Sequence, residues 1–328
     1  MNDSTSQSPS AKSEHLTVDL DVIAQRLYDV PNVLTRIVRD YGFDTTPASP
    51  RALAEALWAE FGQTPIEDPH LQQPSNRTVF RAAVRSIGSN SRSWATYLRT
   101  EPELEELLFQ FDPVEVNASV EDGRISVSSI GRFLPGQSSS GDARAIIKWA
   151  KRLAGGGLFH EELRAIAACF ESMAKRELPG GFEQGELFLC VVGFLGYPPN
   201  RWLKKADLPE HLRGRSAEEW KLPGMGYALT SEMLRNLRWD GYKADRHIMR
   251  LLDSWVPELV EASQERALQL AALIGTKSRG LLDVLAFSLA GMSLAPDGIP
   301  RSHVDNMIWA LGAYVEKKGH ESNIAFVV

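Results

Sequence analysis

Apolar residues recur at steps of three and four along most of the chain, which is the spacing of an amphipathic helix. Over residues 16–112 this pattern predicts a series of helices, and in one of them Leu53 and Leu57 fall on a single face. Ser49 is placed to cap that helix, and Pro50 is placed in its first turn. We therefore expect an N-terminal helical region, most simply explained as a small helical subdomain.

The period of the pattern changes between residues 113 and 140. Two segments, VEVNASV and ISVSSI, alternate β-branched or apolar residues with polar ones, and they flank Asp122 and Gly123. Alternation around an Asp-Gly pair favours a β-hairpin with a tight turn. We expect a short β-hairpin and a linker here, with a domain boundary in the same segment.

Helical periodicity returns over residues 141–318. Glycine-rich breaks at 155–157 and 179–181 separate its apolar helices. The expected fold is mainly α, with the N-terminal helical extension and the hairpin preceding a larger helical domain. Residues 1–15 are polar and rich in Ser, which predicts a disordered tail, and residues 319–328 are expected to form a C-terminal tail.

Composition narrows the class of protein. The chain has 328 residues, of which 43% are hydrophobic, so it is long enough for two domains or one large core. Cys169 and Cys190 lie in apolar segments; two buried thiols are too few for an iron–sulfur cluster or a cysteine zinc site. No segment has the pattern of a signal peptide or a membrane span, so we expect a cytoplasmic protein without a membrane partner.

The formal net charge of -6 argues against a protein that coats nucleic acid non-specifically. Charge is unevenly distributed, however. Residues 199–250 contain eleven Lys or Arg against seven Asp or Glu, a local charge of +4. Residues 77–99 contain five arginines and no acidic residue, which is compatible with a DNA-facing surface and more typical of a solvated helical face. These arginines are Arg77, Arg81, Arg85, Arg92 and Arg99.

The sequence LPGMG, residues 222–226, predicts a tight turn between two helices. Its proline ends the preceding helix, for which Ser216 is a suitable N-cap, and its glycines let the backbone approach another surface closely. A second helix is expected over residues 227–237. Unpaired amides and the positive end of the dipole at the start of that helix suit a phosphate oxygen. A plain turn without a ligand is the alternative, and these five residues alone do not separate the two.

Asp245 lies nineteen residues beyond Gly226, where another helix is expected to begin. An aspartate at this position is a favoured N-cap, worth about 1 kcal/mol. A fixed carboxylate can also stabilise the oxocarbenium-like charge that develops when an N-glycosidic bond breaks, and can position or deprotonate the attacking water. The two roles are compatible, because capping holds the carboxylate rigid.

Taken together, LPGMGYALTSEML and ADRHIMRLL resemble the helix-hairpin-helix DNA glycosylases, whose pattern is Leu-Pro-Gly-apolar-Gly, a helix, a loop, and an Asp followed two residues later by His. The resemblance is specific over residues 216–250, extends loosely over 140–318 and does not cover 1–135. It implies a two-lobed helical fold and a catalytic role for Asp245. For His247, an ordinary core or surface position is the alternative. Contacts to DNA are implied for Leu222, Gly224, Met225, Gly226, Tyr227, Arg246 and His247.

One departure from the family pattern concerns the nucleophile. Family members that also cleave the strand carry a Lys two residues after the second hairpin glycine, and this chain has Ala228 there. The resemblance therefore implies a monofunctional glycosylase that uses water and belongs to the branch without an iron–sulfur cluster. Lys221 and Lys243 lie close to the motif in the sequence, so a weak lyase activity is compatible with it. No cofactor or catalytic metal is implied, and a structural monovalent or divalent cation at the hairpin is compatible with the pattern.

The implied partner is double-stranded DNA containing a damaged, mismatched or modified base, with no obligate protein partner and a nucleoid-associated location. A flipped-out base needs an aromatic pocket, and the loop over residues 196–202 is a candidate wedge. Candidate pocket residues are Phe159, Trp202, Trp239 and Tyr242, each individually more typical of a core position. The role could be repair or attack on modified foreign DNA. The main alternative is a non-catalytic helix-hairpin-helix DNA-binding protein, and a weaker one is a helical scaffold that binds no nucleic acid.

Overall fold

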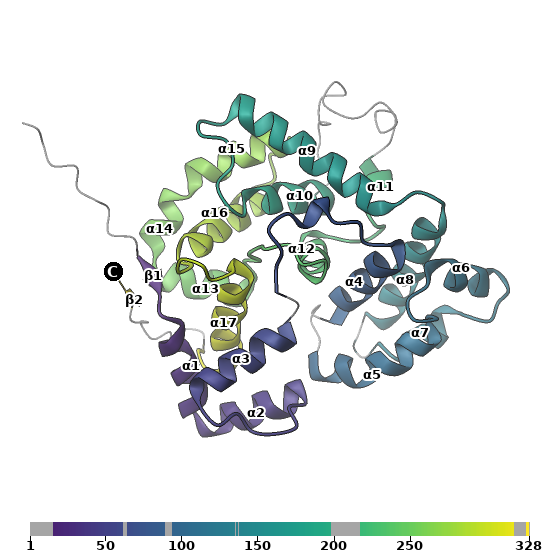
Figure 1. Ribbon diagram of the computed structural model, residues 1–328, viewed down its shortest axis with the longest axis horizontal. Coiled ribbons are helices and arrows are strands. Elements are labelled where there is room, and N and C mark those ends of the chain that lie inside the picture. The colour runs from purple at the N-terminus through teal and green to yellow at the C-terminus, as the bar shows by residue number, and fades with distance from the viewer. Residues whose placement is uncertain are drawn as a thin grey trace, which may run out of the picture.

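The computed structural model describes residues 16–61, 64–88, 94–134, 136, 138–197, 217–317 and 326–327. Within these ranges the protein is built almost wholly of helices (Figure 1), so the prediction of a mainly α protein is confirmed. The described strands are β1 (Thr17–Val18) and β2 (Phe326–Val327), which pair antiparallel. The predicted tail over residues 1–15 lies outside the described residues.

The N-terminal helices contribute to the same core as the C-terminal ones. As predicted, Ser49 caps a helix, because its hydroxyl accepts a hydrogen bond from the amide of Ala52 at 3.2 Å. Helices α1 and α3 pack against α17 (Arg301–Tyr314), and α4 packs along α12 (Tyr227–Asn236). The helices of this part are α1 (Leu20–Asp29), α2 (Pro31–Tyr41), α3 (Pro50–Phe61), the 3-10 helix η1 (Pro69–Leu71), α4 (Asn76–Gly88) and α5 (Trp94–Leu107).

The predicted β-hairpin is wrong. Its residues form two helices, α6 (Pro113–Glu121) and α7 (Val127–Gly131), which pack on α8 (Ser139–Ala154). Asp112 caps α6 by accepting from two amides of the first turn, where Pro113 also lies, and this start signal outweighs the alternating pattern. Gly123, with a φ of 74°, follows the end of α6 instead of turning a hairpin.

Among the remaining helices, α9, α12, α15 and α16 pack against α10, in which nearly every residue is buried. The glycine-rich segments at 155–157 and 179–181 separate α8 from α9 and α9 from α10, as predicted. Both cysteines are buried. No helix in the described ranges is both long and apolar enough to cross a membrane. These helices are α9 (Phe159–Glu177), α10 (Glu186–Gly196), α11 (Ala217–Trp220), α12 (Tyr227–Asn236), α13 (Arg246–Trp255), α14 (Pro257–Ala262), α15 (Gln264–Ile274), α16 (Arg279–Ser293) and α17 (Arg301–Tyr314).

Candidate nucleic-acid site

The LPGMG hairpin joins α11 to α12 and is anchored by its apolar side chains. Leu222 and Met225 are both buried, and the amide of Met225 closes the turn by donating to the carbonyl of Leu222 at 3.1 Å. Trp149 of α8 donates from its indole nitrogen to the carbonyl of Pro223 at 2.8 Å. Because Leu222 and Met225 bury their side chains, only their backbone is available to a ligand.

The two hairpin glycines are exposed but have different backbone conformations. Gly224 has a φ of 79°, in the left-handed region that disfavours residues with a Cβ. Gly226 has a φ of -91° and a ψ of -178°, an extended conformation that any residue adopts. A Cβ at either position would meet no atom within 4 Å. The turn therefore requires glycine at 224, whereas glycine at 226 leaves the backbone at the start of α12 accessible to a ligand.

Helix α12 begins directly after this surface. The ring of Tyr227 is buried and lies 5.8 Å from that of Tyr197, so only the backbone of Tyr227 is available to DNA. Gly196 permits this close packing, since a Cβ there would lie 2.5 Å from the Cα of Tyr227. The described residues provide no acceptor for the amides of Gly226, Tyr227 and Ala228. Such amides at a helix start favour an anion.

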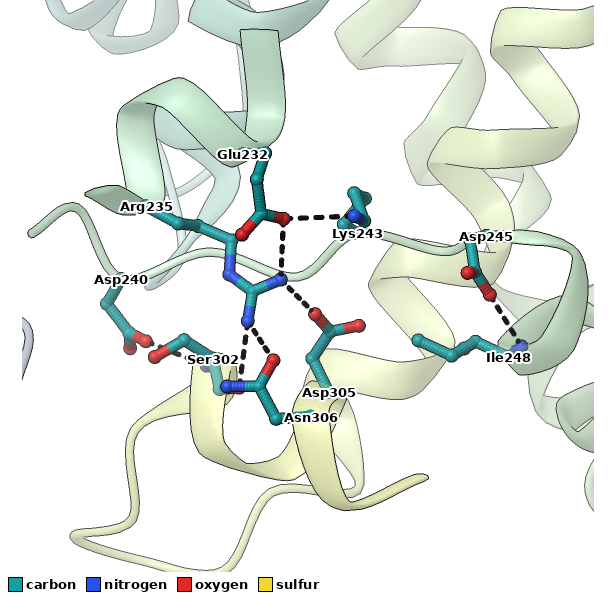
Figure 2. Close-up of polar contacts among 9 residues, drawn as sticks. All are labelled: Glu232, Arg235, Asp240, Lys243, Asp245, Ile248, Ser302, Asp305 and Asn306. Atoms are coloured by element: carbon teal, nitrogen blue, oxygen red, sulfur yellow. Dashed lines mark hydrogen bonds and ion pairs between the residues drawn. The ribbon is translucent and has the colours of Figure 1, made fainter. Parts of the chain in front are cut away.

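Asp245 lies at the N-terminus of α13. Its Oδ1 accepts a hydrogen bond from the amide of His247 at 2.8 Å and another from the amide of Ile248 at 3.1 Å. Figure 2 shows the second of these bonds, and the pair confirms the capping role. Its Oδ2 has no hydrogen-bond partner in the described part of the chain, and the side chain is half-buried. The cap therefore fixes the carboxylate in one orientation and leaves one oxygen for another contact.

The cations that follow Asp245 differ in their surroundings. Arg246 is exposed, whereas His247 is half-buried with its ring edge-on to Trp309 at 6.4 Å. Arg250 donates to the carbonyls of Gly312 and Glu316, each at 3.0 Å, beside the C-terminus of α17. Of these three residues, only Arg246 is fully available to a phosphate.

A network of charged side chains connects α12, α17 and the segment before Asp245 (Figure 2). The ammonium of Lys243 is 2.9 Å from a carboxylate oxygen of Glu232. The guanidinium of Arg235 is 3.5 Å from Glu232 and 2.6 Å from Asp305. It also donates to the side chain of Asn306. The positive charge that the sequence assigns to residues 199–250 therefore includes two cations, Lys243 and Arg235, that are paired inside the protein.

Burial and ion pairing shift the pKa values of the members of this network. Burial alone would raise the pKa of Glu232, but Lys243 and Arg235 lower it to about 2. Burial alone would lower the pKa of Lys243, but Glu232 raises it above its ordinary value. Burial raises the pKa of Asp305 to about 7, against the opposing effect of Arg235. Lys243 is therefore an ammonium at neutral pH and not a nucleophilic amine.

A cavity of about 1150 Å³ lies beside Trp239, and Asp245 is not among its lining residues. Of the residues that the structure describes, seven acidic ones line this cavity against a single Lys or Arg, Arg301, so the cavity disfavours a nucleotide phosphate. Its acidic lining residues are Glu67, Asp68, Glu171, Glu183, Glu186, Asp240 and Asp297. Phe159 and Tyr242 are fully buried, and Trp202 with most of the predicted wedge loop lies outside the described residues.

The arginines of residues 77–99 are largely engaged by neighbouring side chains. Arg77 pairs with Asp112, and Arg85 lies 2.9 Å from Glu101 and over the ring of Trp94. Arg81 lies over Phe111 and Arg99 donates to Thr96, while Arg92 lies outside the described residues. Each described arginine thus has a side-chain contact, although Arg77, Arg81 and Arg99 are exposed and only Arg85 is half-buried.

No protein-family model matches this chain, and no curated protein or solved structure matches it either. Among the described residues there is also no group of three or more His, Cys, Asp or Glu side chains that could hold a metal ion. The resemblance to the helix-hairpin-helix DNA glycosylases accordingly rests on the residues of the hairpin, α12 and the start of α13.

Proposed function

We propose that the protein is a monofunctional DNA glycosylase that hydrolyses the N-glycosidic bond of a flipped-out damaged, mismatched or modified base and leaves an abasic site. The observation that carries this proposal is the carboxylate of Asp245. One of its oxygens accepts two amide hydrogen bonds at the start of α13, while the other has no partner among the described residues. A carboxylate held in this way is preorganised to act on a developing positive charge.

In this proposal the hairpin binds the DNA backbone and Asp245 acts on the sugar. The amides at the start of α12 bind a phosphate oxygen, and the exposed Arg246 supplies a further positive charge in the first turn of α13. The carboxylate of Asp245 stabilises the charge that develops at C1′ and orients the attacking water. Preorganised electrostatic groups of this kind typically contribute on the order of 10² to 10³ in rate.

Two observations support water, and not an amine, as the nucleophile. Ala228 is exposed on the first turn of α12, where strand-cleaving family members carry a lysine. Lys243, the lysine nearest to Asp245 in the sequence, is paired with Glu232 and has a raised pKa. An amine attacks only when it is deprotonated, so this lysine is in the wrong protonation state.

The test compares Asp245→Asn with the wild-type protein on duplexes that each carry one modified or mismatched base. Abasic sites are detected by strand cleavage in hot alkali. Asparagine is also a good N-cap, so the fold should be retained. Asp253→Asn alters an exposed carboxylate on the same helix and is the matched control. We expect alkali-dependent cleavage by the wild type and the control, a loss of at least ~10² in rate for Asp245→Asn, and no covalent adduct on borohydride treatment.

The enzyme proposal is abandoned if no duplex yields an alkali-labile product, or if Asp245→Asn retains the wild-type rate. A non-catalytic helix-hairpin-helix DNA-binding protein is then the second candidate. Two observations favour it: the large cavity is not lined by Asp245, and two of the expected pocket aromatics, Phe159 and Tyr242, are fully buried. This second candidate predicts that duplex DNA is retained equally by the wild type and Asp245→Asn.

A further inference from the structure

We propose that Lys243 is a positioning residue, which fixes Asp245 relative to the hairpin through its ion pair with Glu232. The inference rests on the proposed glycosylase function, because it concerns how the carboxylate of that site is held. It assigns Lys243 neither to the DNA backbone nor to the reacting sugar.

Three charged residues tie the segment between α12 and α13 to three different helices (Figure 2). The carboxylate of Asp240 accepts from the first amides of α17, those of Arg301 at 3.2 Å and Ser302 at 3.0 Å. Lys243 reaches Glu232 of α12, and Asp245 caps α13. The backbone that carries Asp245 is therefore held on both sides by polar contacts.

The partner of Lys243 is itself held in place. Glu232 is also 3.5 Å from Arg235, which in turn is bonded to Asp305 of α17. The side chains of Lys243 and Glu232 are each only 14% exposed, and in such a site an ion pair is weakly screened by solvent. The same helix, α12, carries the hairpin amides at its N-terminus. The pair thus links the phosphate-binding element directly to the residue two positions before Asp245.

Loss of this link should affect the chemical step more than binding. Without the pair, the backbone at Lys243 is free to move, and a displacement of about 1 Å at a reacting group can cost about 10² in rate. The ammonium is engaged by Glu232, so its removal should not change the number of phosphate contacts.

The test uses Lys243→Met, Lys243→Arg and a matched control, Lys277→Met, which alters an exposed lysine between α15 and α16. We measure the single-turnover rate with enzyme in excess, and the dependence of duplex affinity on salt. We expect Lys243→Met to lower the rate by about 10-fold to 100-fold with an unchanged salt slope. Lys243→Arg should recover most of the rate, and Lys277→Met should behave as wild type.

A second measurement needs no substrate. Amide hydrogen exchange over residues 239–247 should be faster in Lys243→Met than in the wild type or Lys277→Met, because the segment opens more often. If Lys243→Met does not fold, the double variant Glu232→Gln/Lys243→Met replaces it, since neither member of the pair is then left charged and unpaired. Where Lys243→Met and Glu232→Gln both fold, the double variant should lose no more rate than either of them, as expected for residues that act as one unit.

Several results would overturn the inference. A salt slope reduced by about one would mean that Lys243 contacts a phosphate. A borohydride adduct that disappears in Lys243→Met would make it a nucleophile. Unchanged rate and exchange would mean that Asp245 is held without it. Asp245→Asn is measured alongside: if it is fully active, the glycosylase proposal has failed, whereas if it is inactive and Lys243→Met is not impaired, only the positioning role has failed.

Discussion

The hairpin glycines allow a test of DNA binding that separates backbone strain from the loss of a contact surface. Gly224 and Gly226 are both exposed, and a Cβ at either would meet no atom within 4 Å. Only Gly224 has a positive φ, of 79°. An alanine in the left-handed region costs roughly 1–2 kcal/mol. An alanine in an extended conformation costs little, and it can add a few tenths of a kcal/mol by restricting the unfolded chain.

The two substitutions should therefore differ in stability and agree in DNA binding. We expect Gly224→Ala to lower the free energy of unfolding by about 1 kcal/mol and Gly226→Ala to leave it within about 0.5 kcal/mol of the wild type. In either variant a methyl group stands on the surface that would face the phosphate. Loss of a hydrogen bond to a charged group costs about 1.5–3 kcal/mol, which corresponds to a decrease in affinity of roughly 10-fold to 100-fold.

Urea unfolding followed by circular dichroism gives the stability, and fluorescence anisotropy of a labelled duplex at low salt gives the affinity. Gly298→Ala is the matched control, because Gly298 has a φ of 76° and equally open surroundings before α17. It should lose stability as Gly224→Ala does and bind DNA as the wild type does. If Gly226→Ala binds DNA with wild-type affinity, the hairpin is only a turn and the phosphate-binding proposal is refuted.

Three further predictions concern the stability of the contacts that hold the hairpin and the charged network around Arg235. Trp149→Phe removes the indole donor to the carbonyl of Pro223 and should cost about 1–2 kcal/mol, measured as a lower urea midpoint at unchanged helix content. The pKa of Glu232 is lowered from 4.5 to about 2, so its ionisation adds roughly 3 kcal/mol to the free energy of unfolding above pH 4.5, and this contribution is lost as the pH falls towards 2. The variant Glu232→Gln should not show this loss of stability in acid. The pKa of Asp305 is raised to about 7, so the folded protein binds more protons than the unfolded chain from pH 4 to 7, and the free energy of unfolding falls as the pH rises through this range. Asp305→Asn should make the free energy of unfolding less dependent on pH there. An unchanged pH dependence would exclude the raised pKa of Asp305.

Local signals in the sequence predicted helices well where a cap was present and failed where two signals competed. Ser49 and Asp245 mark helix starts that the structure contains. Residues 113–131 alternate like a strand, but Asp112 and Pro113 provide a helix start, and the resulting helices pack on α8. Val116, Ile125 and Ile130 are buried in the resulting interface, whereas Val114 is exposed, and a pattern of period two cannot distinguish such an interface from one face of a sheet.

The candidate site could be predicted only where its parts are close in the sequence. The hairpin and Asp245 lie within one short stretch, so their spacing was informative. Lys243 and Glu232 are eleven residues apart and Arg235 and Asp305 are seventy apart, and both pairs form only because the fold brings their side chains together from separate segments. From the sequence alone, Lys243 and Arg235 are therefore indistinguishable from cations on the protein surface. The same reasoning explains why Phe159 and Tyr242 appeared as pocket candidates although the fold buries them.

The packing of α4 along α12 has a consequence for how the chain can be divided. One face of α12 contacts α10, and another contacts α4, where the side chain of Asn236 also donates to the carbonyl of Ala82 at 3.2 Å. The residues of α4, which the resemblance to the glycosylases does not cover, thus pack against α12, the helix that begins at the hairpin. Proteolysis between residues 1–135 and the rest of the chain is therefore not expected to release an independently stable fragment that contains the hairpin. A ligand that displaces α4 should also displace α12 and the hairpin, although it contacts neither of them.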